Sequence, residues 1–206
     1  PGRMSFAGPG KTPAELDSAV GAGCGSISVE SLDDLEAILA AGERMGKKPR
    51  VSLRVNPLEL SGPFGLKMGG KPTQFGVDEE SAAEALDAIV RAVRADRAEY
   101  VGVHIYAGTQ CLDADAIVTG VENSLRIVSD LEGECGLIAR RINLGGGFGV
   151  AYYEGQRDLD LASTGAGIAK ALKAYKDRRP DTRFVLELGR YLVGPAGCYL
   201  TRVLAL

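Results

Sequence analysis

The stretch Asn143-Leu144-Gly145-Gly146-Gly147-Phe148-Gly149 carries the strongest indication of the fold. Its first residues complete a predicted strand, 141–144, and three consecutive glycines, Gly145, Gly146 and Gly147, follow at once. Glycine lacks a Cβ, so the backbone there can adopt positive φ and bring its N–H groups close to an anion. The stretch predicts a phosphate-binding turn at the carboxyl end of a strand.

A second stretch, Leu186-Glu187-Leu188-Gly189-Arg190-Tyr191, ends another apolar strand, 183–186. It places a carboxylate, Glu187, three residues before a guanidinium, Arg190. An acid–arginine pair beside a phosphate cradle suits a phosphorylated cofactor whose ring carries a basic nitrogen. Pyridoxal 5'-phosphate has both features, so we expect it as the cofactor.

Strands and helices alternate along the chain. Apolar runs predict six strands, and helical patterns, several of them with N-terminal caps, fill the five gaps. This order predicts an α/β fold with a parallel sheet, in which functional residues follow the strands at their carboxyl ends. The predicted strands are 3–8, 26–29, 50–55, 100–105, 141–144 and 183–186, and the helices begin at Thr12 or span 31–44, 80–97, 113–131 and 163–179.

Composition excludes several classes of protein. The 206 residues carry a net charge of −3 without basic clusters, which argues against nucleic-acid binding. No apolar run approaches the ~20 residues of a membrane span, and the N-terminus, 1–3, shows no leader. Four widely spaced cysteines indicate reduced thiols and a cytoplasmic protein. His104 is the only histidine, which argues against a zinc hydrolase or a Ser-His-Asp mechanism, and we expect no metal.

Several segments resemble, in family order and over essentially the whole chain, the fold-type III pyridoxal-phosphate decarboxylases, the ornithine/diaminopimelate decarboxylase superfamily. Two stretches, 68–76 and 187–194, look most similar to the branch of exosortase- or exopolysaccharide-associated decarboxylases and carrier-protein-linked glutamyl decarboxylases. The segments that carry the resemblance are 6–11, 51–57, 74–76, 102–110, 145–147 and 187–190.

The resemblance implies an eight-stranded α/β (TIM) barrel followed by a β-rich domain, in a homodimer with shared active sites. The family's Schiff-base lysine lies in an early Tyr-Ala-x-Lys-type motif that this chain lacks, and Lys11 matches a different family strand. We therefore expect a fragment, inactive alone, with about six of the eight barrel strands. We assign 1–193 to a partial pyridoxal-phosphate-binding barrel and 194–206 to the first strand of a truncated C-terminal β domain.

The same resemblance implies a role for individual residues. Glu187 is the catalytic residue that keeps the pyridine nitrogen protonated. Tyr106 replaces a histidine that stacks on the ring in better-known members, and His104 shares its strand face, either in the site or as an interior residue. The expected cofactor-binding residues are Arg54, His104, Tyr106, Thr109, Gly145, Gly146, Gly147, Glu187, Gly189 and Arg190.

The expected activity is decarboxylation of an amino acid or of an amino-acyl group on a carrier protein. Gln74, where members acting on dibasic amino acids often have lysine, favours a carrier-linked or glutamate-like substrate. Three alternatives remain: a non-catalytic relative that regulates or carries the cofactor, a racemase of similar fold, and a sugar-phosphate barrel enzyme. Glu187 argues against the racemase, because alanine racemases of this fold type place an arginine at the ring nitrogen.

Overall fold

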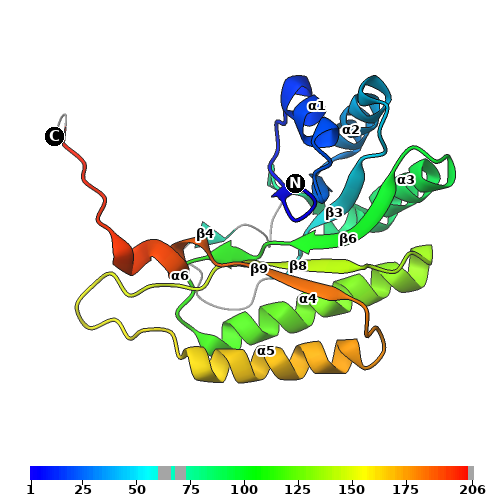
Figure 1. Cartoon of the computed structure of the whole chain (residues 1–206). Coiled ribbons are helices and arrows are strands. Elements are labelled where there is room, and N and C mark those ends of the chain that lie inside the picture. Colours follow the sequence, from blue (N-terminus) through cyan, green and yellow to red (C-terminus); the bar gives the residue numbers. More distant parts are fainter. Residues whose placement is uncertain (60–65, 68–72, 204–206) are drawn as a thin grey trace.

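The computed structural model describes residues 1–59, 66–67 and 73–203. Its centre is a parallel sheet of six main strands in the order β1-β2-β3-β6-β8-β9. Figure 1 shows the sheet curling, with helices α1 to α5 along one side of it. The strands are β1 (Ser5–Phe6), β2 (Ser26–Val29), β3 (Arg50–Asn56), β6 (Glu99–Ile105), β8 (Arg141–Gly146) and β9 (Arg183–Glu187).

Each gap between these strands contains a helix, as predicted. Local sequence explains where the helices begin: Thr12 and Glu15 form a capping box around Pro13 at the start of α1. Ser31 accepts a hydrogen bond from the Asp34 N–H at the start of α2. The helices are α1 (Pro13–Gly21), α2 (Leu32–Met45), α3 (Ala82–Arg94), α4 (Ala114–Cys135) and α5 (Leu161–Lys176).

One face of the sheet, which we call the helix face, is apolar. Side chains alternate between the two faces of a strand, and on β3 the residues Val51, Leu53 and Val55 join the hydrophobic core together with helix residues such as Ile38 and Ile89. This core stabilises the fold by removing apolar surface from water. The helix face also includes Ile27, Val29, Val103, Ile105, Ile142 and Leu144.

The opposite face, which we call the inner face, is polar. Closed α/β barrels usually fill this side with bulky branched residues. On β2, β3, β6 and β8 this face instead carries polar residues that are at most 7% exposed, so the interior of the curve holds groups that need hydrogen-bond partners. The inner face consists of Ser26, Ser28, Ser52, Arg54, Asn56, His104 and Asn143.

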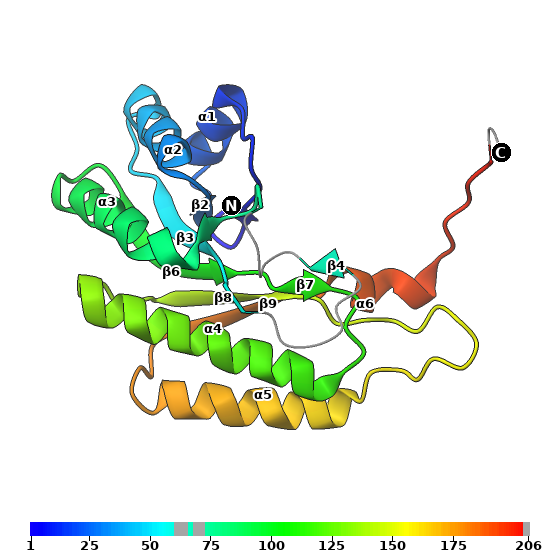
Figure 2. The same cartoon turned by 180° about the vertical axis from the view of Figure 1, so that it is seen from behind.

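Several short elements were not predicted. β4 (Leu66–Lys67) pairs antiparallel with β7 (Gly108–Thr109) (Figure 2), and β5 (Val77–Asp78) pairs with β3. A short 3₁₀ helix, η1 (Glu79–Ser81), precedes α3. These elements lie in the connections that follow β3 and β6, so they surround the carboxyl ends of the strands.

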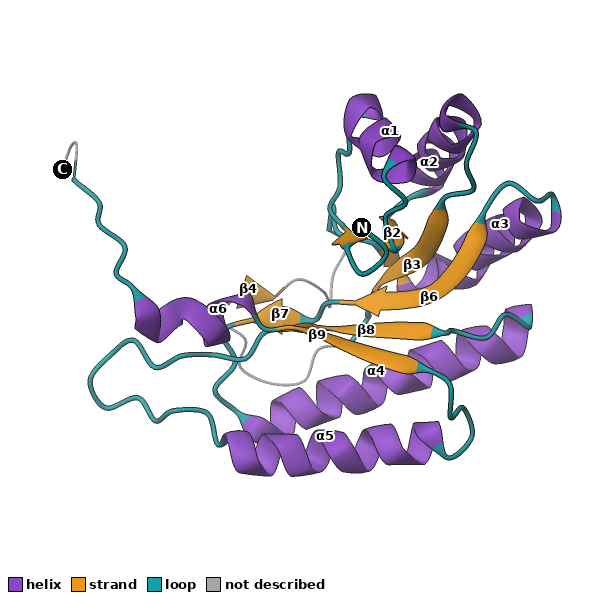
Figure 3. Cartoon of the chain, in the orientation of Figure 1, coloured by secondary structure: helices purple, strands orange, loops and turns teal. Residues whose placement is uncertain are grey.

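The C-terminal end differs from the prediction. A short helix, α6 (Gly189–Val193), and a 3₁₀ turn, η2 (Gly194–Ala196), follow β9. Residues 197–203 have no regular secondary structure and lead away from the sheet (Figure 3), so the predicted strand is not formed in this described part of the tail. A strand needs a neighbour for its backbone hydrogen bonds, and no described strand pairs with this segment. The division into domains at 193/194 stays a prediction.

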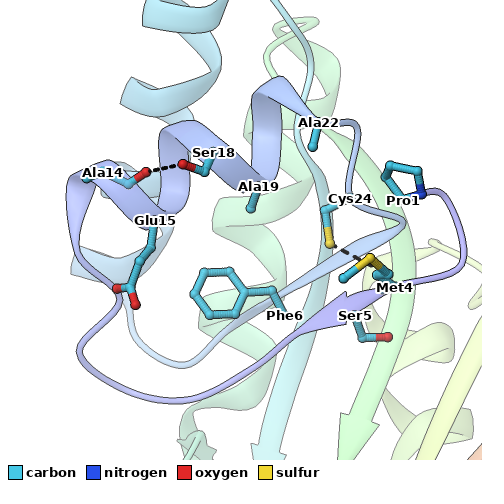
Figure 4. Close-up of a pocket in the computed structure, with 10 residues that line it drawn as sticks. All are labelled: Pro1, Met4, Ser5, Phe6, Ala14, Glu15, Ser18, Ala19, Ala22 and Cys24. Carbon is cyan, nitrogen blue, oxygen red and sulfur yellow. Dashed lines mark hydrogen bonds between the residues drawn. The ribbon is translucent and has the colours of Figure 1, made fainter.

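A groove with a largely apolar lining lies beside β1, the edge strand of the sheet (Figure 4). Phe6 of β1 and Ala19 of α1 contribute to its walls, together with Met4 and Cys24. None of the predicted site residues lines it. In the described part of the chain, no helix has the length and apolar content required to cross a bilayer.

Candidate active site

Four of the predicted site residues, Arg54, His104, Gly146 and Glu187, lie at paired positions on neighbouring strands. The parallel register pairs Arg54 of β3 with His104 of β6, and His104 with Asn143 of β8. Gly146 then pairs with Glu187 of β9. Because these positions are at the carboxyl ends of parallel strands, their side chains meet at one end of the sheet.

Glu187 is held by two neighbours. Its Oε1 accepts a hydrogen bond from Asn143 Nδ2 at 2.8 Å, and its Oε2 lies 3.7 Å from His104 Nε2. His104, followed by Asn143, lowers the pKa of Glu187 to about 2, against the opposing effect of partial burial. The carboxylate is 38% exposed and stays ionised throughout the neutral range.

Arg54 is paired with a residue that the sequence did not single out. Its Nη1 donates to both carboxylate oxygens of Glu30 at 3.0 Å, and both side chains are buried. Glu30 also accepts hydrogen bonds from the backbone N–H groups of Gly8 and Gly76. The Arg54 guanidinium lies 5.2 Å from the centre of the Phe75 ring. Glu30 thus ties together three loops at the carboxyl end of the sheet.

The glycine turn packs against its neighbours where side chains would not fit. Gly145 has φ 66°, and a Cβ there would lie 2.7 Å from a ring carbon of Tyr106. A Cβ on Gly146 would lie 1.9 Å from the carbonyl oxygen of Glu187. The N–H of Gly145 donates to Asn143 Oδ1 at 2.9 Å, so Asn143 links the turn to Glu187. Asn143 was quoted in the motif but given no role; its position two residues before Gly145 was the available signal.

A second group of contacts joins the loops around the glycine turn. The Cys111 N–H donates to the carbonyl of Gly147 at 2.8 Å. Gln110, with φ 61°, exchanges hydrogen bonds between its side-chain amide and the backbone of Val150. Arg190 of α6 approaches Gln110 Oε1 at 3.4 Å. Arg190 therefore contacts the loop after β6, which is hydrogen-bonded to the loop that contains the glycine turn.

The remaining predicted residues have these positions. Gly189 is the first residue of α6, and open space surrounds the position its Cβ would take. Thr109, half-buried, is the second residue of β7, opposite Leu66. Within the described residues, Thr109 makes no hydrogen bond to the glycine turn. Most of the predicted loop 68–76 lies outside the described residues, but Gln74 is described and exposed.

His104 is buried and makes one hydrogen bond. Its Nδ1 lies 3.1 Å from Ser28 Oγ. Ser26 Oγ donates to Ser52 Oγ at 2.9 Å, and Ser52 Oγ lies 3.5 Å from Ser28 Oγ. Within the described ranges, His104 Nε2 has no hydrogen-bond partner. The sequence left open whether His104 is a site residue or an interior one; in the structure it is buried, and its Nε2 faces Glu187.

Comparison with known proteins identifies the family of the chain. Residues 1–194 match the family model of the pyridoxal-dependent decarboxylase pyridoxal-binding domain. The chain is 38% identical over 201 residues to L-glutamyl-[BtrI acyl-carrier protein] decarboxylase of Niallia circulans, covering 97% of this chain and 46% of that protein. It is 34% identical over 199 residues to diaminopimelate decarboxylase of Neisseria meningitidis serogroup A, covering 96% and 47%.

Solved structures agree on the fold. Diaminopimelate decarboxylase of Helicobacter pylori, complexed with L-lysine, aligns with a TM-score of 0.77 at 30% identity, over 91% of this chain and 45% of that chain. The M. jannaschii enzyme aligns with a TM-score of 0.78 at 27% identity, over 92% and 44%. The predicted partial α/β barrel is thereby confirmed.

The chain spans about half the length of the relatives it matches, since it covers 46% and 47% of the first two. The family match, in contrast, extends over nearly all of the chain, from residue 1 to residue 194. This chain therefore belongs to the pyridoxal-binding domain family of the pyridoxal-dependent decarboxylases.

Proposed function

We propose that the whole protein is a pyridoxal-phosphate-dependent carboxy-lyase that removes CO2 from an amino acid or from an amino-acyl group on a carrier protein. The observation that carries the proposal is the position of Glu187 at the carboxyl end of β9, where Asn143 joins its carboxylate to the glycine turn. When bound, pyridoxal phosphate supplies an electron sink for the electron pair left by CO2, provided that its ring nitrogen stays protonated. Glu187 is ionised at neutral pH, so its negative charge is suited to stabilise the protonated ring nitrogen.

The residues around Glu187 fit such a cofactor. The Glu187 carboxylate suits a protonated ring nitrogen on one side of the site. In the glycine turn, Tyr106 and Glu187 occupy the space that a Cβ on Gly145 or Gly146 would need, so these positions accept only glycine. We propose that Gly146, Gly147 and Gly189 offer backbone N–H groups to the phosphate. Gly145 contributes close packing instead, because Asn143 already accepts the hydrogen bond from its N–H.

The charged and aromatic residues have proposed roles on either side of the ring. Arg190, carried on α6 beside Gln110, adds positive charge at the phosphate. Tyr106 packs on the glycine turn and offers an aromatic face for stacking. Thr109 adds a hydroxyl near the phosphate. Arg54, whose charge is balanced by Glu30, borders the ring.

The experiment compares Glu187→Gln with the unchanged whole protein. A neutral amide cannot keep the ring nitrogen protonated, so we expect kcat to fall about 10²-fold or more, roughly 2.7 kcal/mol in activation free energy, while cofactor affinity changes little. Glu36→Gln, at an exposed position on α2, serves as the matched control. An unchanged kcat for Glu187→Gln would refute the proposed role.

The same assay addresses the substrate. We propose a carrier-linked or glutamate-like substrate; the similarity to a decarboxylase named for a glutamyl group on an acyl-carrier protein supports it. The unchanged protein is offered glutamyl thioesters and, separately, free lysine, ornithine, arginine and diaminopimelate, and CO2 release is measured. Turnover of a free dibasic amino acid without turnover of the thioester would contradict this part of the proposal.

We further propose that the protein works in the cytoplasm as a homodimer whose subunits share active sites. All four cysteines are free thiols, which is the state that a reducing compartment maintains. Sedimentation of the whole protein measures its mass in solution, and a monomer with full activity would contradict the shared sites.

A further inference from the structure

The buried imidazole of His104 has a nitrogen that points at Glu187 without bonding to it. His104 is 2% exposed, and its Nε2 has no hydrogen-bond partner in the described part of the chain. The nearest acidic atom is Glu187 Oε2, at 3.7 Å. Hydrogen bonds of catalytic groups are often long without substrate and shorten in the complex. A buried ring nitrogen without a hydrogen bond costs folding free energy. Its orientation towards Glu187 therefore calls for an explanation.

The serines of the inner face place a hydroxyl that can donate to Nδ1 of His104. Ser26 donates to Ser52, which leaves the Ser52 hydroxyl hydrogen to point towards Ser28, 3.5 Å away. The Ser28 hydroxyl hydrogen can then be donated to His104 Nδ1, at 3.1 Å. With Nδ1 as the acceptor, the neutral ring carries its hydrogen on Nε2. The opposite tautomer would set the lone pair of Nε2 against the carboxylate of Glu187.

Arg54 lowers the pKa of Glu187 through its charge alone, and less than His104 and Asn143 do. It is the register neighbour of His104 on β3, but its guanidinium is bonded to both oxygens of Glu30. The charged groups that face His104 are therefore the balanced Arg54–Glu30 pair on one side and Glu187 on the other. Since Asn143 holds Oε1 of Glu187, His104 is the group available to Oε2.

We propose that His104 is a positioning residue for Glu187: an Nε2–H, fixed by Ser28 through Nδ1, orients Oε2 and keeps the carboxylate ionised. The inference rests on the proposed function, because it explains how the acid assigned to the ring nitrogen is held. In this arrangement, each hydroxyl or ring N–H from Ser26 to His104 donates its hydrogen bond towards Glu187. The polar residues of the inner face would then orient the Glu187 carboxylate as well as fill the interior.

The first test reads the tautomer directly. His104 is the only histidine of this chain, so ¹⁵N-histidine labelling gives one imidazole signal set. In the whole protein, the imidazole signals of His104 are identified as those that disappear in His104→Gln. We expect the Nε2–H form to predominate, and Ser28→Ala to increase the Nδ1–H form. Ser124→Ala removes a buried hydroxyl that bonds to α4 instead, and serves as the control. A predominant Nδ1–H form in the unchanged protein would overturn the inference.

The second test uses two amides that mimic opposite ring nitrogens. The amide of His104→Gln places an N–H near the position of Nε2, whereas that of His104→Asn reaches only the position of Nδ1. The ionisation of Glu187 is followed by ¹³C NMR, with thermal unfolding to check the fold. We expect its pKa to stay near 2 in His104→Gln and to rise towards the ordinary 4.5 in His104→Asn.

The outcomes separate this inference from the proposed function. Equal pKa values for Glu187 in His104→Asn and the unchanged protein would overturn the positioning role, even if Glu187→Gln still slowed the reaction. Conversely, an unchanged kcat in Glu187→Gln would refute the proposed function and leave the His104–Glu187 coupling standing. If both His104 variants unfold, the tautomer shift in Ser28→Ala decides the matter.

Discussion

The two faces of the central sheet follow opposite rules although they share the same strands. On β3, Val51, Leu53 and Val55 face the helices and are at most 1% exposed. Between them, Ser52 and Arg54 face inward; they are also buried, at 6% and 7% exposed, but polar. One face is held together by apolar area, and the other by particular pairs of donors and acceptors.

This difference teaches where the chain tolerates change. Apolar side chains of similar volume can replace one another at modest cost, so the helix face permits many sequences. On the inner face, removal of one partner leaves the other buried without its hydrogen bond or counter-charge. The inner face is therefore the more specific half of the sheet, and the residues of the candidate site lie on it.

The largest expected effect comes from breaking the buried ion pair of the inner face. Glu30→Ala leaves Arg54 buried and unpaired, and we expect a loss of about 3–5 kcal/mol in the free energy of unfolding. Asp177→Ala breaks the exposed Lys173–Asp177 pair and should cost less than about 0.5 kcal/mol. Urea unfolding measures both. Similar losses in the two variants would mean that the Glu30–Arg54 pair contributes no more than a surface contact.

A neighbouring pair of residues on β3 compares the two faces directly. Leu53→Ala removes a fully buried side chain from the helix face and should cost about 2–5 kcal/mol. Ser52→Ala removes one hydroxyl from the inner face and should cost about 0.5–1.5 kcal/mol. Chemical denaturation of both variants gives the comparison. If Ser52→Ala proved as costly as Leu53→Ala, the serine series would be a main source of stability as well as of orientation.

The third comparison, with a smaller leading effect than the first two, concerns the glycine turn. Gly145→Ala puts a Cβ against Tyr106 at positive φ and should destabilise by about 1–3 kcal/mol. Gly133→Ala, at an exposed site on α4 with open space for a Cβ, should instead stabilise by about 0.5–1 kcal/mol. Thermal unfolding midpoints should move in opposite directions. A shift of the same sign in both would show that the turn yields to a side chain.

Much of the fold could be predicted from local sequence. The capping box at Thr12 and the alternating strands identified the order of elements, because caps and side-chain periodicity act within a few residues. α6 was missed because five residues after a strand give little periodicity. The strand expected after residue 196 was wrong for 197–203, because apolar residues alone do not supply a neighbouring strand.

The site was predictable only in part. Glu187 and the glycine turn could be recognised within single segments. The partners that hold them could not, because Glu30 and Arg54 are 24 residues apart and Asn143 and Glu187 are 44 apart, and their meeting depends on strand register. The alternation of serine with apolar residues from Ser26 to Val29 was nevertheless a visible sign of a polar inner face.

The loops that follow β6 and β8 are joined at several points. Cys111 exchanges backbone hydrogen bonds with Gly147 and Gly149, and the side chain of Gln110 bonds to both backbone groups of Val150. For protein engineering, the two loops therefore form a single transplantable module. A designer who grafts one loop from a relative with another specificity should move the other with it, because a chimaera with mismatched loops would lose their shared hydrogen bonds.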